Sequence, residues 1–427
     1  MGDDKILLRC AWRLIPFMTL LYVVNFLDRV NVGFAALTIN KDLGFSPSAF
    51  GFGAGVFFFG YAAFQVPANV VLERVGARRW IFCIMAVWGA ISASNAFVQS
   101  AGGFTIMRFL LGAAEAGFVP GVFFYLTLWF PPAYRARFIA SFMAAAPISA
   151  IIGGPLSGVI LGMDDLLGLR GWQWLFLIEG LPACVLAFAA LKFLPDDPES
   201  AAWLSGDEKK VICRRLAAES FVEHRNLWRA LCDVRVIALG LVNFGVLCGV
   251  NGVALWLPQI VRQMGFSNLQ TGFVVALPSV ASAVTMILWG RSSDAKGERI
   301  WHVAIPALIA AASFVVSSLT QIDLVMLIAL SITQIMLWSA IAPLIAMPSS
   351  FLGGSARAGG IALVVSIGSL GGFLGSTIIG VLKDRTGDYA ASMAVIGVIL
   401  VLAAVIVLAL GRAMAPRQAA AQPSRVI

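Results

Sequence analysis

Asn69-Val-Val-Leu-Glu73-Arg74-Val-Gly76-Ala-Arg78-Arg79 recurs later in the chain in an altered form, as Gly290-Arg-Ser-Ser-Asp294-Ala-Lys-Gly297-Glu-Arg299. An acid, a glycine and an arginine stand four, seven and nine positions after the first residue of each copy. Each copy follows the second long apolar segment in a set of six. The repeat therefore predicts two structurally equivalent halves related by an axis along a membrane normal.

Long apolar segments recur from end to end, and each is long enough to cross the ~30 Å hydrocarbon layer of a bilayer. We expect an all-α membrane protein with twelve transmembrane helices in two pseudo-symmetric six-helix bundles, at 12–38, 49–71, 79–99, 104–128, 137–162, 172–194, 236–261, 270–292, 301–320, 324–347, 358–382 and 389–411. The expected parts are an N-terminal bundle (1–194), a cytoplasmic linker with a short surface helix (195–235), a C-terminal bundle (236–411) and a disordered cytoplasmic tail (412–427).

Composition excludes most other classes of protein. Hydrophobic residues make up 60% of the chain and charged residues only 12%, whereas soluble proteins carry about 25% charged residues. The net charge of +8 is spread over the gaps between apolar segments, so we expect no nucleic-acid partner. The six cysteines form no C-x-x-C pair, and no nucleotide loop or nucleophile–base pattern is found. The sequence therefore predicts no cofactor, no metal and no enzyme activity.

The distribution of Lys and Arg predicts the orientation of the chain in the membrane. Twenty-two of these residues fall at the termini and in alternate gaps, against five in the other gaps: Lys41, Arg170, Arg262, Lys383 and Arg385. Positive residues favour the cytoplasmic side. Both termini are therefore expected in the cytoplasm, in a multi-pass protein of the inner (plasma) membrane of a bacterium.

The charged loops of the repeat lie where the two halves would meet on the cytoplasmic side. The glycine of each copy permits a sharp turn. One interpretation is topogenic positive charge on a short loop. We favour a gating latch built from Glu73, Arg74, Gly76, Arg78, Asp294, Gly297 and Arg299.

Several segments carry a resemblance to a known family. The repeated loop resembles the cytoplasmic signature of the major facilitator superfamily. Further matches are Phe26-Leu-Asp28-Arg29-Val-Asn31-Val-Gly33, Arg108-Phe-Leu-Leu-Gly-Ala-Ala-Glu115-Ala-Gly, Gly171-Trp-Gln-Trp-Leu-Phe-Leu-Ile-Glu179-Gly-Leu-Pro182, Trp256-Leu-Pro258-Gln259 and Ser366-Ile-Gly-Ser369-Leu-Gly-Gly-Phe373. Together they resemble the anion:cation symporter family, which carries tartrate-like, sugar-acid and aromatic carboxylates with protons. That family usually has asparagines where this chain has Ser366 and Ser369.

Ionisable residues inside apolar segments are costly and mark a pathway or a relay by default. Five lie well within the expected helices, all in the N-terminal half: Asp28, Arg29, Arg108, Glu115 and Glu179. Arginine stays charged and grips carboxylates through a fork of donors. A buried acid is balanced between burial, which favours its neutral form, and a nearby cation, which favours its carboxylate. A substrate anion and a proton can therefore compete for one cluster.

These residues have functional and structural interpretations. The functional one, which the resemblance supports, assigns Arg29 to the substrate carboxylate, and Asp28 and Glu115 to proton binding. In the other, Asp28–Arg29 and Arg108–Glu115 are static pairs that balance charge between helices. Arg108 could bind substrate or extend to the membrane surface, and Glu179 more often belongs to structure in such a setting.

Polar and aromatic residues on other helices could complete a substrate site, although each alone is more often a packing residue. They are Tyr61, Asn251, Trp256, Ser366 and Ser369. Tyr61 is the strongest of these by its position in the resemblance.

We expect a secondary active transporter that imports a small organic anion with protons by alternating access and functions as a monomer. Its partners would be the anion, protons and the lipid bilayer. Gly154-Pro155-Leu-Ser-Gly158 partly resembles the pattern of proton-coupled exporters, so an exporter is the first alternative. A transport-dead membrane sensor on the same fold is the second, although no signalling domain is found.

Overall fold

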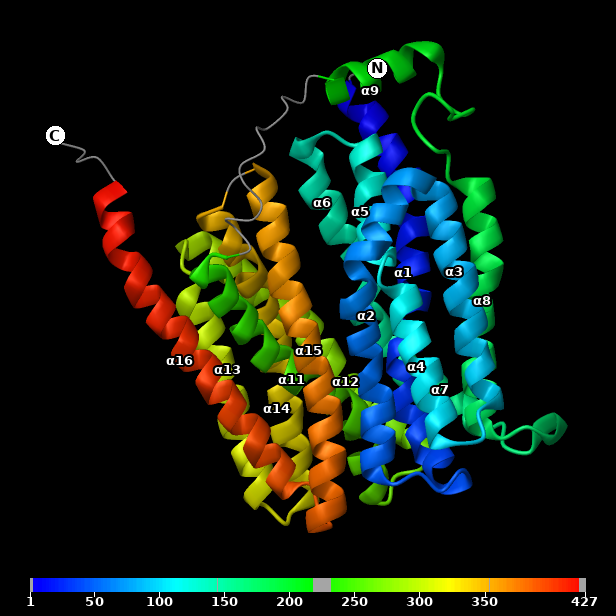
Figure 1. Ribbon diagram of the computed structural model, residues 1–427, viewed down its shortest axis with the longest axis vertical. Coiled ribbons are helices and arrows are strands. Elements are labelled where there is room, and N and C mark those ends of the chain that lie inside the picture. Colours follow the sequence, from blue (N-terminus) through cyan, green and yellow to red (C-terminus); the bar gives the residue numbers. More distant parts are fainter. Residues whose placement is uncertain (1–2, 144, 218–231, 353, 422–427) are drawn as a thin grey trace. The chain divides into compact units, whose positions relative to one another are not determined.

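The computed structural model describes residues 3–143, 145–217, 232–352 and 354–421. The long helices are α1 (Asp3–Asp42), α2 (Pro47–Val75), α3 (Ala77–Ser94), α4 (Ala101–Glu115), α5 (Phe118–Trp129), α6 (Pro132–Met143), α7 (Ala145–Ile160), α8 (Gly171–Phe193), α9 (Gly206–Ala217), α11 (Val234–Gln263), α12 (Asn268–Lys296), α13 (Ile300–Leu319), α14 (Asp323–Ala346), α15 (Gly354–Thr386) and α16 (Ala390–Ala421) (Figure 1). Short 3-10 turns lie at Asn95–Phe97, Leu166–Gly168 and Met347–Ser350.

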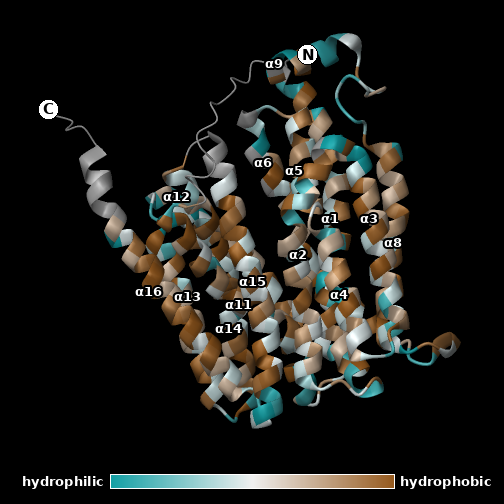
Figure 2. Ribbon diagram, in the orientation of Figure 1, coloured by the Kyte–Doolittle hydropathy of each residue, from teal (hydrophilic) through white to brown (hydrophobic). Residues whose placement is uncertain are grey.

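The prediction of twelve membrane helices is confirmed. Within the described ranges, twelve helical segments are long and apolar enough to cross a membrane. Their middles are hydrophobic, and hydrophilic residues gather toward the ends, as Figure 2 shows by colour. This pattern is compatible with a bilayer, because helices pair their backbone groups internally while their apolar side chains face lipid.

One membrane span is divided where the structure describes it. The span Ala101–Trp129 contains α4 and α5, which are separated at Ala116 and Gly117. The sequence predicted one continuous helix at 104–128, so this prediction was wrong at its centre. The indole Nε1 of Trp80 on α3 donates to the carbonyl oxygen of Gly117 over 3.1 Å. The same carbonyl accepts from the backbone N–H of Gly121 over 3.0 Å, so α3 adds a second donor at the start of α5.

The chain divides into two compact units of nearly equal content. Unit 1 contains residues 1–45, 56–221 and 265–276, and unit 2 contains 46–55, 222–264 and 277–427. The change between the two main blocks falls in the polar segment that the sequence predicted as a linker. Two helices belong to both units: α2 begins in unit 2, and α12 begins in unit 1.

Glycines allow close helix contacts inside each unit. In unit 2, a Cβ added at Gly371 or Gly375 of α15 would meet the backbone of Phe244 or Cys248 of α11. In unit 1, a Cβ at Gly112 of α4 would meet the backbone of Phe57 on α2. Small residues permit this approach in membranes, where packing replaces the hydrophobic effect between helices. The contact at Gly112 brings α2 and α4 together beside the charged residues of α1.

The linker contains the surface helix that the sequence predicted, whereas the C-terminal segment is more helical than predicted. Helix α9 is the expected surface helix, and it contacts the N-terminal end of α1 through Arg9–Glu208 (2.6 Å) and Arg215–Asp4 (3.0 Å) (Figure 1). The tail was expected to be disordered from 412, but α16 continues to Ala421. Alanine-rich sequence favours this extension because alanine is the best helix former. Residues 422–427 lie outside the described part.

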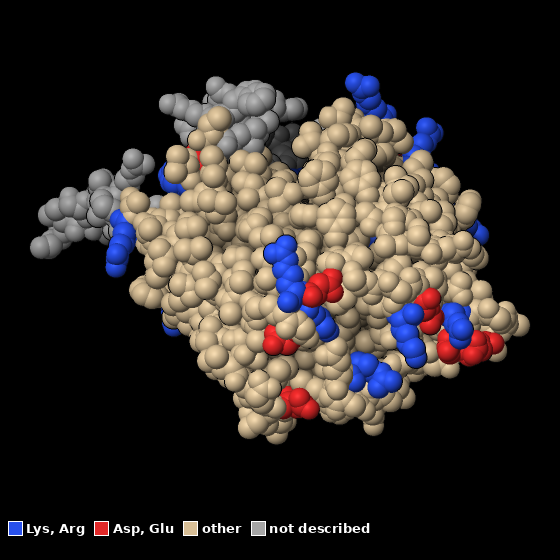
Figure 3. All heavy atoms as spheres, turned by 60° about the horizontal axis from the view of Figure 1, so that its bottom comes forward, with Lys and Arg blue, Asp and Glu red and all other residues tan. Residues whose placement is uncertain are grey.

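Charged side chains are sparse on the face seen in Figure 3, and some of the basic groups there lie next to acidic ones. In unit 1, the segment after α7 contains exposed ion pairs, where Arg170 contacts Asp165 (3.0 Å) and Asp164 (3.8 Å). Exposed pairs of this kind contribute little to stability. The buried charges of unit 1 carry more information.

Candidate functional site: a buried ion-pair cluster in unit 1

Arg29 of α1 and Glu115 of α4 form an ion pair in the interior of unit 1. The guanidinium Nε donates to Oε2 of Glu115 over 2.9 Å. The Glu115 side chain is fully buried, whereas 22% of the Arg29 side chain is exposed. Glu115 is the last residue of α4 and directly precedes the break before α5. The carboxylate is therefore enclosed by protein, whereas part of the arginine side chain is accessible. The Nη2 of Arg29 is buried and has no hydrogen-bond partner among the described residues.

Aromatic rings of α2 line the arginine side of the cluster. The guanidinium carbon of Arg29 lies 5.0 Å from the centre of the Tyr61 ring and 5.3 Å from that of Phe57. Arg108 of α4 lies 4.8 Å from the same Phe57 ring. Such contacts favour a cation, more so where water is excluded. Phe57 thus contacts both arginines.

Arg108 is almost completely buried, with 3% of its surface exposed. Its Nε and Nη1 have no hydrogen-bond partner among the residues that the structure describes. Its charge acts on Asp28 and Glu115, although neither lies at ion-pair distance in the described set. The interpretation that Arg108 extends to the membrane surface does not fit this burial. A buried cation with free donors can accept an anion, but only where the anion can reach it.

Asp28 of α1 is held by neutral donors. The hydroxyl of Ser92 on α3 and the amide of Asn31, one turn along α1, both donate to Oδ1, the latter over 3.3 Å. Oδ2 has no hydrogen-bond partner in the described part of the chain. Asp28 is 1% exposed. It therefore faces the interior of unit 1, next to the arginine cluster but not paired with Arg29 by a hydrogen bond that the structure describes.

Glu179 of α8 is the fifth buried ionisable residue, with 3% of its surface exposed. The hydroxyl of Ser157 on α7 donates to its Oε1 over 3.1 Å. All five membrane charges that the sequence singled out are thus gathered in unit 1, on α1, α4 and α8. The static pair Arg108–Glu115 that one interpretation expected is not formed; Glu115 pairs with Arg29 instead.

The cluster can exchange one negative partner for another. An arginine that is paired and partly exposed can release its carboxylate when that carboxylate takes up a proton. The freed guanidinium then offers two parallel donors to another carboxylate. Burial makes an unpaired charge costly, both when Arg29 is paired with Glu115 and when it binds another carboxylate, so each charge needs a partner of opposite sign. Among the described residues, no group of three or more His, Cys, Asp or Glu side chains could hold a metal ion.

The predicted substrate residues of unit 2 make local contacts. Asn251 of α11 donates to the carbonyl oxygen of Leu247 on its own helix over 2.9 Å. Ser369 of α15 donates to the carbonyl oxygen of Val365 over 3.0 Å. Ser366 is half-buried on the same helix. Asn251 and Ser369 thus each donate to a carbonyl oxygen of their own helix.

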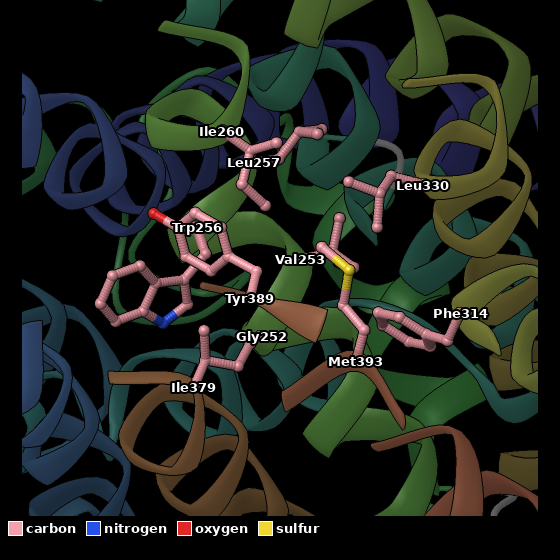
Figure 4. Close-up of a pocket in the computed structure, with 10 residues that line it drawn as sticks. All are labelled: Gly252, Val253, Trp256, Leu257, Ile260, Phe314, Leu330, Ile379, Tyr389 and Met393. Carbon is pink, nitrogen blue, oxygen red and sulfur yellow. The ribbon is translucent and has the colours of Figure 1, made fainter. Parts of the chain in front are cut away.

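Trp256 of α11 is buried in the packing of unit 2. Its Nε1 donates to the carbonyl oxygen of Ser376 over 3.1 Å, and its ring packs against Phe50 and Tyr389. It also borders a small cavity, whose labelled lining side chains in Figure 4 are almost all apolar. The cavity has room for about one water molecule. It is too small for an organic acid.

The two copies of the repeated loop form ion pairs within their own units. Gly76 and Gly297 both have positive φ, at 85° and 62°, as the sharp turns require. Arg299 contacts Asp294 over 3.1 Å, whereas Arg78 contacts Asp196 over 3.0 Å and donates to the carbonyl oxygen of Leu191. The side chain of Arg74 is exposed, and that of Glu73 lies outside the described part. The gating role of this loop stays a prediction.

Sequence reasoning missed the neutral residues of the cluster. Asn31 could have been found, because it follows Asp28 by three positions and so shares its helix face. Asn25 could have been found in the same way, because it precedes Asp28 by three positions. The contributions of Phe57, Ser92 and Ser157 come from helix packing, and no spacing in the sequence indicates them. Asn25, which is fully buried, interacts with Glu115.

Comparisons with known proteins agree with this architecture. The sequence model described as Major Facilitator Superfamily matches residues 18–375. A protein of Agrobacterium vitis to which tartrate transport is ascribed is 46% identical over 413 residues, which cover 96% of this chain and 95% of that protein. The quinolone resistance transporter of Acinetobacter baumannii is 37% identical over 403 residues, 93% of either chain.

Among solved structures, a bacterial homologue of the human lysosomal transporter Spinster, crystallised in an inward-facing and unoccupied conformation, has the same fold. The TM-score is 0.79 over 99% of both chains, at 18% sequence identity. At this identity the likeness concerns the fold alone.

Proposed function

Since the chain belongs to the major facilitator superfamily and is a multi-pass membrane transporter, we propose that it imports a small organic anion together with protons by alternating access. The substrate class is hydroxydicarboxylates, sugar acids or aromatic carboxylates. The protein would act in a bacterial inner membrane, with both termini in the cytoplasm.

The ion pair between Arg29 and Glu115 is the observation that supports this proposal most directly. It joins an arginine, whose side chain is partly accessible and whose Nη2 has no hydrogen-bond partner among the described residues, to a fully buried carboxylate. Protonation of Glu115 would release Arg29 for the substrate carboxylate. Return of the proton to water would restore the pair and expel the substrate. Proton and anion would thus depend on each other.

Asp28 would be the second proton-binding residue of the import cycle. Its neighbours Arg29 and Arg108 both act on its charge. An anion that approaches these arginines would weaken their hold on the carboxylate and favour protonation. We assign substrate binding to Arg29 with Tyr61 as its aromatic support, and leave Arg108 as a second cation facing Phe57.

The test uses purified protein in proteoliposomes. A thermal-shift screen of hydroxydicarboxylates, sugar acids and aromatic acids selects the substrate. Acid outside the vesicles should then drive uphill uptake by the wild type. Asp28→Asn or Glu115→Gln should abolish uphill uptake and spare some exchange at equal pH. Asp323→Asn, at the exposed start of α14, is the matched control and should behave as the wild type. Uphill uptake retained by both cluster variants would remove Asp28 and Glu115 from the coupling role.

Export in exchange for protons is the second candidate, and similarity to the quinolone resistance transporter favours it. The two functions differ in the direction of flux under one proton gradient. An importer accumulates its substrate on the side to which protons flow, and an exporter accumulates it on the opposite side. Repeating the vesicle assay with a preloaded fluoroquinolone and with the selected acid distinguishes them.

A further inference from the structure

A polar chain crosses unit 1 from Asp28 to Glu179. Asn31 stands between these two acids: its amide donates to Oδ1 of Asp28 over 3.3 Å and also interacts with the carboxyl of Glu179. Each acid has its own serine donor, Ser92 for Asp28 and Ser157 for Glu179. Four helices, α1, α3, α7 and α8, contribute to this chain.

Three oxygen atoms in this chain are left without a hydrogen-bond partner among the described residues. They are Oδ2 of Asp28, Oδ1 of Asn31 and Oε2 of Glu179. A buried polar atom without a partner is costly. All three of these oxygens are hydrogen-bond acceptors. A proton on Oε2 of Glu179 would turn that atom into a donor. The vacant acceptor on Asn31 suits such a donor.

The charges around Glu179 also indicate a proton. No cation lies at ion-pair distance from it in the described set, and the charged group that acts on it is Asp28, another acid. Among the described residues, the polar side chains that interact with it are Asn31 of α1 and Ser157 of α7. On α3, which also packs against α8, Ser92 donates to Asp28. Ionisation of two neighbouring buried carboxylates at once costs free energy, because like charges repel and burial disfavours each charge.

We infer that Asp28 and Glu179 form a proton-sharing pair, with Asn31 as the group that adapts to the position of the proton. With the proton on Glu179, the amide oxygen of Asn31 accepts from it and the amide nitrogen donates to ionised Asp28. With the proton on Asp28, the amide turns by half a rotation and both hydrogen bonds reverse. No bond other than these O–H bonds forms or breaks.

Glu179 and Asp28 lie at different depths along their helices. Glu179 lies eight residues from the start of α8, about 12 Å along the helix, and Asp28 lies fourteen residues from the end of α1, about 21 Å. Both distances are measured from the end of unit 1 that is opposite the N-terminus, the lower end in Figure 1. Glu179 therefore lies between Asp28 and that end. This inference rests on the proposed proton coupling and extends it by one carboxyl toward the outer surface.

Infrared difference spectroscopy tests the pair without any substrate. The full chain in lipid is titrated with acid, and the C=O stretching bands of protonated carboxyl groups are recorded. Glu179→Gln should remove one pH-dependent band that Glu115→Gln retains. Asp28→Asn should move the titration midpoint of that band, because the acids are coupled. Identical bands in the wild type and Glu179→Gln would show that Glu179 does not exchange a proton, and would overturn the inference.

A second variant keeps the test decisive if Glu179→Gln does not fold. Ser157→Ala removes the hydroxyl that donates to Glu179 and should change the frequency of its band. Ser149→Ala is the matched control on the same helix, because the Ser149 hydroxyl donates to the carbonyl oxygens of Val23 and Ala145. A band that is unchanged in Ser157→Ala would contradict the assignment. Failure of proton-driven uptake would overturn the proposed function, whereas these spectra decide the pair by themselves.

Discussion

Arg29 and Glu115 are 86 positions apart in the sequence, and in the fold their side chains meet over 2.9 Å. The pair lies where α4 ends, so a break in a membrane helix presents its last carboxylate to α1. Discontinuous helices are a common way to place ion-binding groups at mid-membrane depth. The proposed exchange of proton and anion depends on this contact.

Arg29→Lys should weaken binding of the selected acid at least about tenfold, which corresponds to about 1.4 kcal/mol. Lysine keeps the charge but loses the planar fork that holds a carboxylate with two donors. Isothermal titration calorimetry on the purified protein measures the effect. Arg79→Lys, on the exposed start of α3, should bind as the wild type does. Equal affinities for both variants would exclude Arg29 from the substrate carboxylate.

Gly112→Ala should lower the stability of unit 1 by about 1–3 kcal/mol, since the added methyl group overpacks a close helix contact. The Cβ would meet the backbone of Phe57. A Cβ added at Gly102 on the same helix would meet nothing within 4 Å, so Gly102→Ala should be neutral or slightly stabilising. Thermal unfolding in detergent compares the two variants. A similar effect at both positions would argue against the contact.

Trp80→Phe should destabilise the protein by about 0.5–1.5 kcal/mol, because it removes one of the two donors to the Gly117 carbonyl and leaves only the Gly121 N–H. The indole of Trp80 satisfies Gly117 at the break between α4 and α5. Trp12→Phe is the control, since the Trp12 side chain is exposed on α1. Unfolding midpoints and uptake rates should be measured together. If Trp80→Phe unfolds like the control, the break does not depend on this hydrogen bond.

The carboxylate of Glu298 should make the stability of the protein depend on pH in the acid range. Burial raises the pKa of Glu298, but donation from the backbone N–H groups of Trp301 (2.8 Å) and His302 (3.3 Å) and from His302 Nδ1 (2.8 Å) outweighs it, so the pKa lies below its usual 4.5. A lowered pKa means that the contribution is complete above pH 4.5 and is lost as the pH falls below it.

The measurement for Glu298 is the difference in unfolding temperature between the wild type and Glu298→Gln. That difference should be largest near neutral pH and should shrink as the pH falls below 4.5. Asp323→Asn, on an exposed helix start in the same unit, supplies the comparison. A difference that stays constant with pH would mean that the carboxylate charge of Glu298 does not contribute.

Much of the fold could be predicted because a bilayer imposes simple rules on sequence. The apolar segments indicated all twelve spans, and the repeat at Gly76 and Gly297 indicated two matching turns, both with positive φ. The break at Gly117 was missed because an apolar segment with Ala-Gly at its centre looks like a continuous helix. The extension of α16 beyond 411 was missed because proline in the segment suggested disorder.

The candidate site was predictable only in its charges. Asp28, Arg29, Arg108, Glu115 and Glu179 stand out because ionisable residues are rare in membrane helices. Their pairing did not follow from the sequence, and the static interpretation had paired Arg108 with Glu115. Pairing depends on how α1 and α4 are turned toward each other, and that is set by contacts such as Gly112 against Phe57.

The sequence by itself determined that this protein lies in a membrane, how many spans it has and which spans carry charge. These properties depend on the composition of the chain and on the spacing of its apolar segments. Tertiary structure alone decided that Arg29 meets Glu115, that Asn31 stands between two acids, and that Trp256 is a packing residue of unit 2. Such contacts join segments far apart in sequence. Their geometry depends on the rotation and depth of each helix, which side-chain packing fixes to a few ångströms and hydropathy does not.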